Sequence, residues 1–339
     1  KFFNYEGYKL PDEIEERMEG IILDNREEIV TPIGSEIGKR TRVDKAGDLY
    51  IEFLKNTIDV DFKGLKIALD CANGASYEVA PKIFKELGAQ VEVFYNQPDG
   101  ININKNCGST HPENLQKFVV DNGCDLGLAF DGDADRLIAV DHTGAVVDGD
   151  KIMVICGLHL KGQGKLKDDT VVVTVMSNMG LDIALQENGC KTVKTKVGDR
   201  YVLEKMLESG YSLGGEQSGH VVFLDYNTTG DGLLTALQLI SVLIYTKKSL
   251  NELAQIMDVY PQVLANANVS NQKKQDYIRD EAIQKEIQKV EKHFHGKGRV
   301  LIRPSGTEPL VRVMIEGENQ EELNKIANNL AKLIEERLK

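Results

Sequence analysis

The chain has 339 residues, of which 41% are hydrophobic and 28% charged, a composition typical of soluble globular proteins. One hydrophobic core of ordinary size cannot serve a chain of this length, so two to four domains are expected. The formal net charge of −12 argues against a nucleic-acid partner, because binding to the phosphate backbone requires a basic face or stripe. An anionic small molecule can still bind where basic residues gather locally.

The cysteines and the most apolar segment suggest where the protein works. The five cysteines are widely spaced and never form Cys-x-x-Cys, which favours neither disulfides nor a zinc site and predicts a reducing, cytoplasmic compartment. The most apolar run, at 233–245, is shorter than the roughly 20 residues of a membrane span and contains Thr, Gln and Ser. It predicts a buried helix, and no membrane partner is expected.

The first part of the chain begins with a helix and continues into an α/β unit. Residues 11–30 place apolar side chains at helical spacing among acids, and the polar stretch 31–48 is a candidate linker. A short apolar strand at 65–69 is followed by a loop, a helix that ends at Gly88 and a second strand at 90–95. This order predicts a layer of strands covered by helices.

The same order recurs about a hundred residues later. A strand at 170–175, a helix that ends at Gly189 and a strand at 191–197 predict a second α/β domain. The last part differs, with a charged helical segment around 271–292, two strands and a final helix from about 319 that carries one apolar stripe. These elements predict a small α+β domain.

Three aspartates crowd one short connection between two predicted strands. Asp131, Asp133 and Asp135 alternate with small residues, and their mutual repulsion costs folding free energy unless a cation offsets it. A few carboxylates, with phosphate or water completing the shell, suit Mg²⁺, and Arg136 beside them can hold a phosphate oxygen. An EF-hand is disfavoured, because its sixth and twelfth positions would be Arg136 and His142. A solvated acidic turn and a phosphatase with an aspartyl nucleophile remain alternatives.

The stretch Arg-Pro-Ser-Gly-Thr-Glu-Pro at 303–309 lies between two predicted strands. Its two hydroxyl side chains, the backbone N–H groups around its glycine and two arginines together favour a phosphate. The residues of this set are Arg303, Ser305, Gly306, Thr307 and Arg312. The alternative is an ordinary turn that contains Pro and Gly.

The stretch Leu-Gly-Gly-Glu-Gln-Ser-Gly-His at 213–220 is a candidate reader of sugar hydroxyls. Its glycines let a ligand approach the backbone, Glu216 can accept hydrogen bonds from two adjacent hydroxyls, and Ser218 can donate or accept. The spacing excludes a nucleophile elbow, because Gly-x-Ser-x-Gly would need glycine where Glu216 and His220 stand. A glycine-rich hairpin turn is the alternative.

The stretch 195–202 joins a predicted strand to a predicted helix. Lys196, Asp199 and Arg200 lie around its glycine, and a helix start with basic residues nearby favours an anionic substrate. Solvated surface charges are the alternative interpretation of these three residues.

Taken together and in this order, the three loops resemble those of the α-D-phosphohexomutase superfamily, over essentially all 339 residues. The resemblance implies a multi-domain α/β fold, with mixed α/β domains around a central cleft and a small C-terminal α+β domain. The implied domains are 1–42, a remnant of domain 1 without its catalytic serine loop; 43–148 with the metal-binding loop; 149–258 with the sugar-binding loop; and 259–339 with the phosphate-binding loop.

The resemblance also implies a reaction. The segments Leu-Gly-Gly-Glu-Gln-Ser-Gly-His and Val-Gly-Asp-Arg-Tyr-Val resemble the branch that interconverts glucosamine 6-phosphate and glucosamine 1-phosphate, on the route to UDP-N-acetylglucosamine. In that family a phosphoserine and Mg²⁺ act through a bisphosphorylated sugar. Carried over, the aspartates at 131, 133 and 135 would bind the metal, Arg136 would act at the transferring phosphate, and the loops at 216–218 and 303–312 would hold the sugar and its other phosphate.

The chain departs from the family at its start. The family's catalytic serine lies in a Ser-His-Asn-Pro stretch that no serine here matches, and the first ten residues resemble the segment that the family carries directly after that stretch. Lys1 would then match a family lysine that shuttles protons. A chain without the serine is expected to bind sugar phosphate poorly and to catalyse nothing. A mannose or glucose phosphate substrate, a non-catalytic fragment that binds sugar phosphate, and a homodimer are left open.

Overall fold

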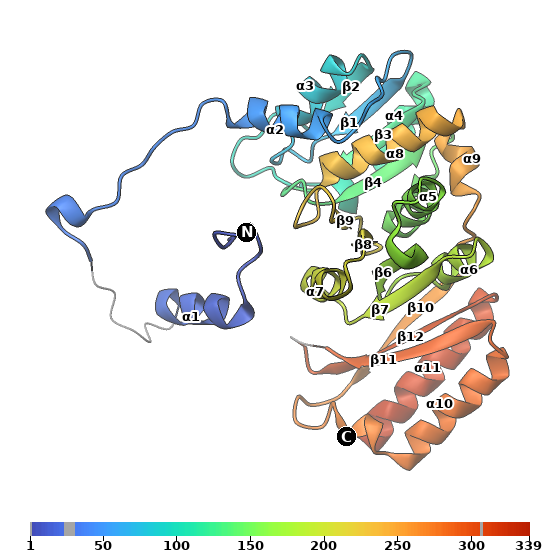
Figure 1. Ribbon diagram of the computed structural model, residues 1–339. Helices are drawn as coiled ribbons and strands as arrows, with labels where there is room; N and C mark the ends of the chain where they lie inside the picture. Colours follow the sequence, from blue (N-terminus) through green and yellow to red (C-terminus); the bar gives the residue numbers. More distant parts are fainter. Residues whose placement is uncertain (1, 24–30, 306–307) are drawn as a thin grey trace.

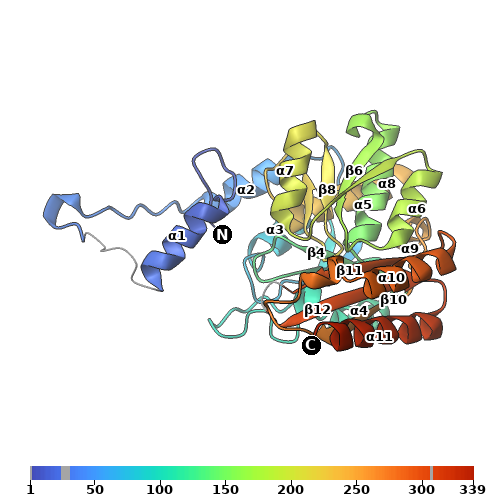
Figure 2. The same cartoon turned by 90° about the horizontal axis from the view of Figure 1, so that it is seen from below.

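The computed structural model describes residues 2–23, 31–305 and 308–339. Three β-sheets with their helices follow one another along the chain, and an N-terminal segment precedes them (Figure 1). This segment contains α1 (Asp12–Ile22), the short 3-10 helix η1 (Gly34–Glu36) and α2 (Ala46–Lys55). The residues between η1 and α2 are exposed and run outside the body of the molecule, which fits a linker (Figure 2). The last part of the helix predicted at 11–30 lies outside the described residues.

The first sheet has the strand order β2-β1-β3-β4-β5. Strand β1 pairs in parallel with β2 and β3, and then β4 and β5 add antiparallel strands. The predicted end of the helix between β1 and β2 is confirmed, because Gly88 follows it with a φ of +94° that suits glycine. The elements are β1 (Lys66–Asp70), α3 (Val79–Glu86), β2 (Gln90–Phe94), η2 (Gly108–Thr110), α4 (Glu113–Asn122), β3 (Leu126–Phe130), β4 (Leu137–Asp141) and β5 (Val146–Val147).

The second sheet repeats this pattern with the order β7-β6-β8-β9. Strand β6 pairs in parallel with β7 and β8, and β9 is antiparallel, so the predicted repeat of the α/β order is confirmed. Helix α6 begins at Met179, where the Asn178 side chain caps it by accepting from Gly180 N at 3.0 Å. The elements are α5 (Gly149–Gly162), η3 (Lys167–Asp169), β6 (Thr170–Thr174), α6 (Met179–Glu187), β7 (Lys191–Thr195), α7 (Asp199–Ser209), β8 (Leu213–Gly215) and β9 (Val221–Phe223).

A buried helix joins the first two sheets into one apolar core. Helix α8 (Gly232–Thr246) follows β9 in the chain but packs against α2, α5 and β4 as well, and α9 (Leu250–Ala254) follows it. The helix predicted for the most apolar run is therefore confirmed. No helix in the described part of the chain combines the length and the apolarity that crossing a membrane requires. All five cysteines are buried as free thiols.

The C-terminal sheet, with the order β10-β12-β11, has its own apolar core, which two helices cover (Figure 1). In Figure 1 it lies below β6 and β7. The elements are β10 (Gln262–Asn268), η4 (Asp276–Ile278), α10 (Glu281–Phe294), β11 (Gly298–Pro304), β12 (Leu310–Gly317) and α11 (Gln320–Arg337).

Two expectations for this domain were wrong. Strand β10 was not predicted, although Val263, Ala265 and Ala267 alternate with exposed residues; Ala and Asn are depleted in strands and weakened the signal. Helix α10 begins ten residues later than the charged segment suggested. Asp280 caps it by accepting from the backbone N–H groups of Ala282 and Ile283 at 3.0 and 3.1 Å, and this capping sets the helix start.

Candidate functional site

Two loops from different sheets meet at one place. They are the carboxylate loop (residues 131–137), which joins β3 to β4, and the Glu216 loop (residues 213–220), which turns from β8 into β9. Leu137 N donates to Gly219 O at 3.0 Å, and Gly219 has a φ of +94°. A Cβ at Gly219 would lie 2.1 Å from Leu137 O, so only glycine permits this approach. The structure thus brings together two loops that the sequence predicted separately.

The carboxylates of the first loop border a cavity of about 430 Å³. Asp133 and Asp135 line it together with Asn227 and Asp231 from the segment between β9 and α8. Asp131 is half-buried, and burial is the main reason why its pKa is raised; the Asp133 charge raises this pKa further, while Arg136 lowers it. The loop therefore carries a concentration of negative charge at the edge of this cavity.

The donor chemistry of this loop fits Mg²⁺, but the side chains do not yet converge. Among the residues that the structure describes, no three His, Cys, Asp or Glu side chains stand close enough together to hold a metal ion. Asp133 is exposed, so its side chain can change rotamer at little cost and turn toward Asp131 and Asp135. Oxygen donors from carboxylates are those that Mg²⁺ prefers. Binding of Mg²⁺ by Asp131, Asp133 and Asp135 therefore remains a prediction, which the chemistry of their carboxylates supports.

Arg136 and Glu216 bring opposite charges to the meeting point of the two loops. The Arg136 Nε atom is buried and has no hydrogen-bond partner within the described part of the chain, which makes it a ready donor to an anion. Burial raises the pKa of Glu216, and the Arg136 charge is among the factors that oppose this rise. The Glu216 carboxylate accepts from Gly198 N at 3.1 Å, and Ser218 beside it is exposed. Ser218 can therefore reach a ligand.

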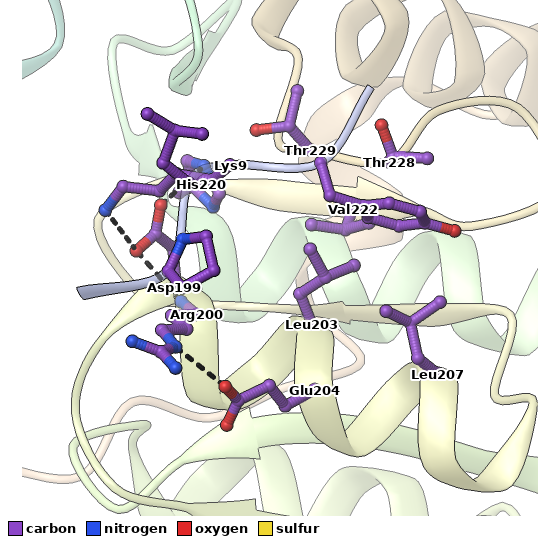
Figure 3. Close-up of a pocket in the computed structure, with 13 residues that line it drawn as sticks. Lys9, Asp199, Arg200, Leu203, Glu204, Leu207, His220, Val222, Thr228 and Thr229 are labelled. Carbon is purple, nitrogen blue, oxygen red and sulfur yellow. Dashed lines mark hydrogen bonds and ion pairs between the residues drawn. The ribbon is translucent and has the colours of Figure 1, made fainter. Parts of the chain in front are cut away.

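A buried histidine connects these loops to the start of α7. His220 Nε2 lies 3.7 Å from an Asp135 oxygen and 3.8 Å from an Asp199 oxygen. Lys9, from the N-terminal segment, approaches Asp199 to 3.9 Å, and these residues border a cavity of about 160 Å³ (Figure 3). Asp199 was predicted for the site, whereas His220 and Lys9 were not. The signal for His220 was its place at the end of the Glu216 loop.

Two predicted basic residues are directed elsewhere. The Arg200 guanidinium donates to Glu204, one turn further along α7, at 2.7 Å, and both residues border the cavity of about 160 Å³ (Figure 3). The Lys196 ammonium lies over the Tyr201 ring, 5.7 Å from its centre. The roles of both side chains at a substrate remain predictions.

The β11–β12 hairpin gathers the basic groups predicted to bind phosphate. Arg303 stands directly opposite Arg312, and burial, followed by the Arg312 charge, lowers the pKa of Arg303. Like charges across a strand pair destabilise it unless an anion joins them. Ser305 is buried and its carbonyl accepts from the Lys274 ammonium at 2.5 Å, while Arg312 pairs with Glu308 at 2.7 Å. Lys274 was not predicted, because it lies on the remote loop that follows β10.

Three predicted residues lie outside the described residues: Lys1, Gly306 and Thr307.

A cluster of buried acids behind the Glu216 loop was also missed. Asp148 caps α5 and accepts from the Gln217 side chain at 3.3 Å. Asp150, in the first turn of α5, is fully buried, and its Oδ2 accepts from Asn178 N at 2.7 Å. Burial, with the Asp148 and Glu316 charges adding to it, raises the pKa of Asp150 to about 7. No periodic pattern in the sequence indicates this cluster, since Asp148 and Asp150 lie at the start of α5 and Glu316 lies on β12.

The raised pKa of Asp150 predicts a stability that falls as the pH rises. Folded Asp150 holds its proton up to about pH 7, whereas an unfolded carboxyl releases it near 3.8, so between these values the folded state binds more protons. We expect Asp150→Asn to abolish this loss. From pH 4 to pH 8 the free energy of unfolding of the variant should rise relative to that of the parent by roughly 2–4 kcal/mol.

Thermal unfolding followed by circular dichroism across this pH range measures the effect. Asp121→Asn, at an exposed position on α4, is the control and should follow the parent at every pH. If the Tm of Asp150→Asn and the Tm of the parent change with pH in the same way, the raised pKa of Asp150 is contradicted.

Comparison with known proteins places this geometry in context. Residues 48–144, 148–260 and 264–333 match, respectively, the alpha/beta/alpha domain II, the alpha/beta/alpha domain III and the C-terminal domain of "Phosphoglucomutase/phosphomannomutase". The chain is 63% identical to "Phosphoglucosamine mutase" of Clostridium novyi (strain NT) over 337 residues, which cover 99% of this chain and 75% of that protein.

Solved structures share the fold at lower identity. A phosphoglucomutase/phosphomannomutase family protein of Burkholderia thailandensis matches with a TM-score of 0.76 and 24% identity, over 98% of this chain and 72% of that one. N-acetylphosphoglucosamine mutase of Aspergillus fumigatus, in complex with GlcNAc-6P and magnesium, matches with a TM-score of 0.71 and 20% identity, over 87% of this chain and 67% of that one.

Proposed function

The chain belongs to the phosphoglucomutase/phosphomannomutase family, and on this premise we propose that it acts as a phosphoglucosamine mutase. The reaction is the reversible conversion of glucosamine 6-phosphate to glucosamine 1-phosphate, through a phosphoserine and a bisphosphorylated sugar. The observation that carries the proposal is the junction of the carboxylate loop and the Glu216 loop, closed by the Leu137–Gly219 hydrogen bond at 3.0 Å. It supports a single site that handles both the phosphoryl group and the sugar.

The carboxylate loop serves the transferring phosphoryl group in this proposal. Asp131, Asp133 and Asp135 would hold Mg²⁺, which when bound neutralises the charge that develops on the phosphoryl oxygens. Arg136 contributes from the protein side, since its buried Nε–H can donate to a phosphoryl oxygen without first breaking a hydrogen bond to another described residue. The bound cation and the Arg136 guanidinium would both offset the charge of this group and help to hold it in place.

The other two loops hold the ends of the substrate that do not react. Glu216 accepts from sugar hydroxyls and Ser218 can donate or accept, which orients the ring. Arg303 and Arg312, directly opposite each other on β11 and β12, bind the second phosphate, whose charge offsets their mutual repulsion. The bisphosphorylated intermediate has a phosphate at each end. In either orientation, one phosphate can therefore lie at the carboxylate loop while the other is bound by the arginines. Lys1, Gly306 and Thr307 are proposed for the same site on the resemblance alone.

The test is turnover of the full natural protein that contains these residues. Phosphorus NMR should show glucosamine 6-phosphate and glucosamine 1-phosphate approaching equilibrium from either side, with Mg²⁺ present and a phosphorylated serine in the protein. The family also acts on glucose and mannose phosphates, so kcat/KM should be compared across the three sugars. A preference for glucose or mannose phosphate would change the substrate, and release of inorganic phosphate without interconversion would refute the mutase.

The setting of the reaction is also proposed. The substrate is a small, soluble sugar phosphate, and the five free thiols fit a reducing, cytoplasmic compartment. No nucleic-acid or membrane partner is required by this chemistry. A homodimer is compatible with it, and sedimentation analysis of the full natural protein would establish the assembly.

A further inference from the structure

The β11–β12 hairpin carries two charged cross-strand pairs on one face. Arg299 stands opposite Glu316 and Arg303 stands opposite Arg312. The two pairs are four residues apart on each strand, and because side chains alternate with a period of two, both point to the same side. Four residues of strand span roughly 13 Å. One stiff element therefore connects the Arg299–Glu316 pair to the arginines that we propose to bind phosphate.

The Arg299–Glu316 pair anchors this hairpin to the neighbouring domain. Glu316 is fully buried and bonds the Arg299 guanidinium, and its second oxygen accepts from Met179 N at 3.0 Å. Arg299 also donates to Val175 O at 3.2 Å and to Ser177 O. Buried charges are costly unless their remaining polar atoms are satisfied, and here the loop between β6 and α6 satisfies them. The pair therefore specifies how the C-terminal sheet sits on that loop.

The same loop is connected to the sugar side of the site. Asn178 N donates to Asp150 at 2.7 Å, and Asp150 lies in the first turn of α5. At the start of this helix Gly149 N donates to Gln217 O at 3.0 Å, and Asp148 accepts from the Gln217 side chain. Hydrogen bonds, joined through neighbouring residues of the chain, thus connect the Glu216 loop through the β6–α6 loop to the hairpin anchor.

We propose that Arg299 and Glu316 are positioning residues, which set the distance between the phosphate-binding arginines and the Glu216 loop. The proposal deepens the proposed function and rests on it. A sugar phosphate contacts the Glu216 loop through its hydroxyls and the β11–β12 hairpin through its phosphate. Its affinity depends on the distance between these two sites, because once one contact is made the effective concentration for the other is set by the geometry. Inorganic phosphate carries no sugar and cannot contact both sites at once, so its affinity does not depend on their spacing. Loosening the anchor should therefore weaken sugar-phosphate binding without weakening phosphate binding.

Calorimetry on the full natural protein tests this with glucosamine 6-phosphate and inorganic phosphate as probes. In Arg299→Gln we expect the Kd of the sugar phosphate to rise about 10- to 100-fold and that of phosphate to change less than about twofold. Glu316→Gln, which keeps an acceptor for Met179 N, serves if Arg299→Gln does not fold. The matched control is Lys297→Gln, which breaks the exposed Lys297–Glu318 pair (3.4 Å) at the open end of the hairpin and should change neither Kd.

The outcomes separate the two proposals. If the parent protein does not bind glucosamine 6-phosphate, the proposed function fails. If the parent binds it and a folded anchor variant binds both probes as the parent does, or loses both in equal proportion, the positioning role is refuted. A rise in the Kd of the sugar phosphate alone, which a general loss of structure would not produce, supports it.

Discussion

Replacing Asp133 by alanine should lower kcat/KM for the sugar phosphate by about 10²- to 10⁴-fold, because a metal ion that neutralises phosphoryl charge is worth several kcal/mol in the transition state. Asp133 lines the 430 Å³ cavity and is exposed, so its removal opens no hole in a core. It also relieves repulsion with Asp131. The folded protein should therefore keep its stability while losing turnover.

Initial rates of the full natural protein at several Mg²⁺ concentrations measure this effect. The variant should also need more Mg²⁺ to reach its own maximal rate, since the set of carboxylates is reduced. Asp121→Ala, an exposed aspartate on α4, removes the same charge away from the site and should retain the parent rate. Parent-like turnover of Asp133→Ala would remove the basis for assigning the metal to this loop.

Replacing Arg303 by methionine should raise the Kd for glucosamine 6-phosphate by about 30- to 1,000-fold, because losing one partner of a charged hydrogen bond at a binding site costs about 2–4 kcal/mol. Methionine keeps the length of the aliphatic side chain, so the hairpin retains its packing. In the ligand-free protein the same change removes the repulsion between Arg303 and Arg312. We therefore expect Tm without ligand to stay the same or rise, while affinity falls.

These opposite signs distinguish a binding role from a structural one. Isothermal calorimetry gives the affinity, and circular dichroism gives Tm with and without ligand. The control is Arg279→Met, an exposed arginine of the same domain. If Arg303→Met lowers Tm and leaves the Kd unchanged, the arginine supports the fold, and the phosphate must bind elsewhere.

Local patterns accounted for the elements around the site. Sequence patterns predicted the strands on either side of the carboxylate loop and the repeated α/β order. They did so because apolar runs and the glycines that end helices determine conformation within a few residues. Gly88 ends α3 and the run at 233–245 forms most of α8, as predicted. The weak strand β10 was missed because its residues favour other conformations, and only pairing with β12 stabilises it there.

Contacts between remote segments could not be predicted in this way. Arg299 bonds a carbonyl that lies 124 residues earlier in the chain, and nothing near Arg299 in the sequence indicates this partner. The same holds for Lys9 beside Asp199 and for Lys274 on the carbonyl of Ser305. Charged residues are common on surfaces, so their type alone did not separate an anchor from a solvated side chain.

The sequence by itself determined which chemical groups are present: three alternating aspartates, a glutamate in a glycine-rich turn, and arginines around a Ser/Thr loop. Only the tertiary structure decided which of them meet. It closed the Glu216 loop on the carboxylate loop, turned Arg200 toward Glu204 and buried Asp150. The physical reason is that spacing along a chain sets local conformation, whereas burial, pKa shifts and hydrogen-bond partners depend on what packs nearby from other segments.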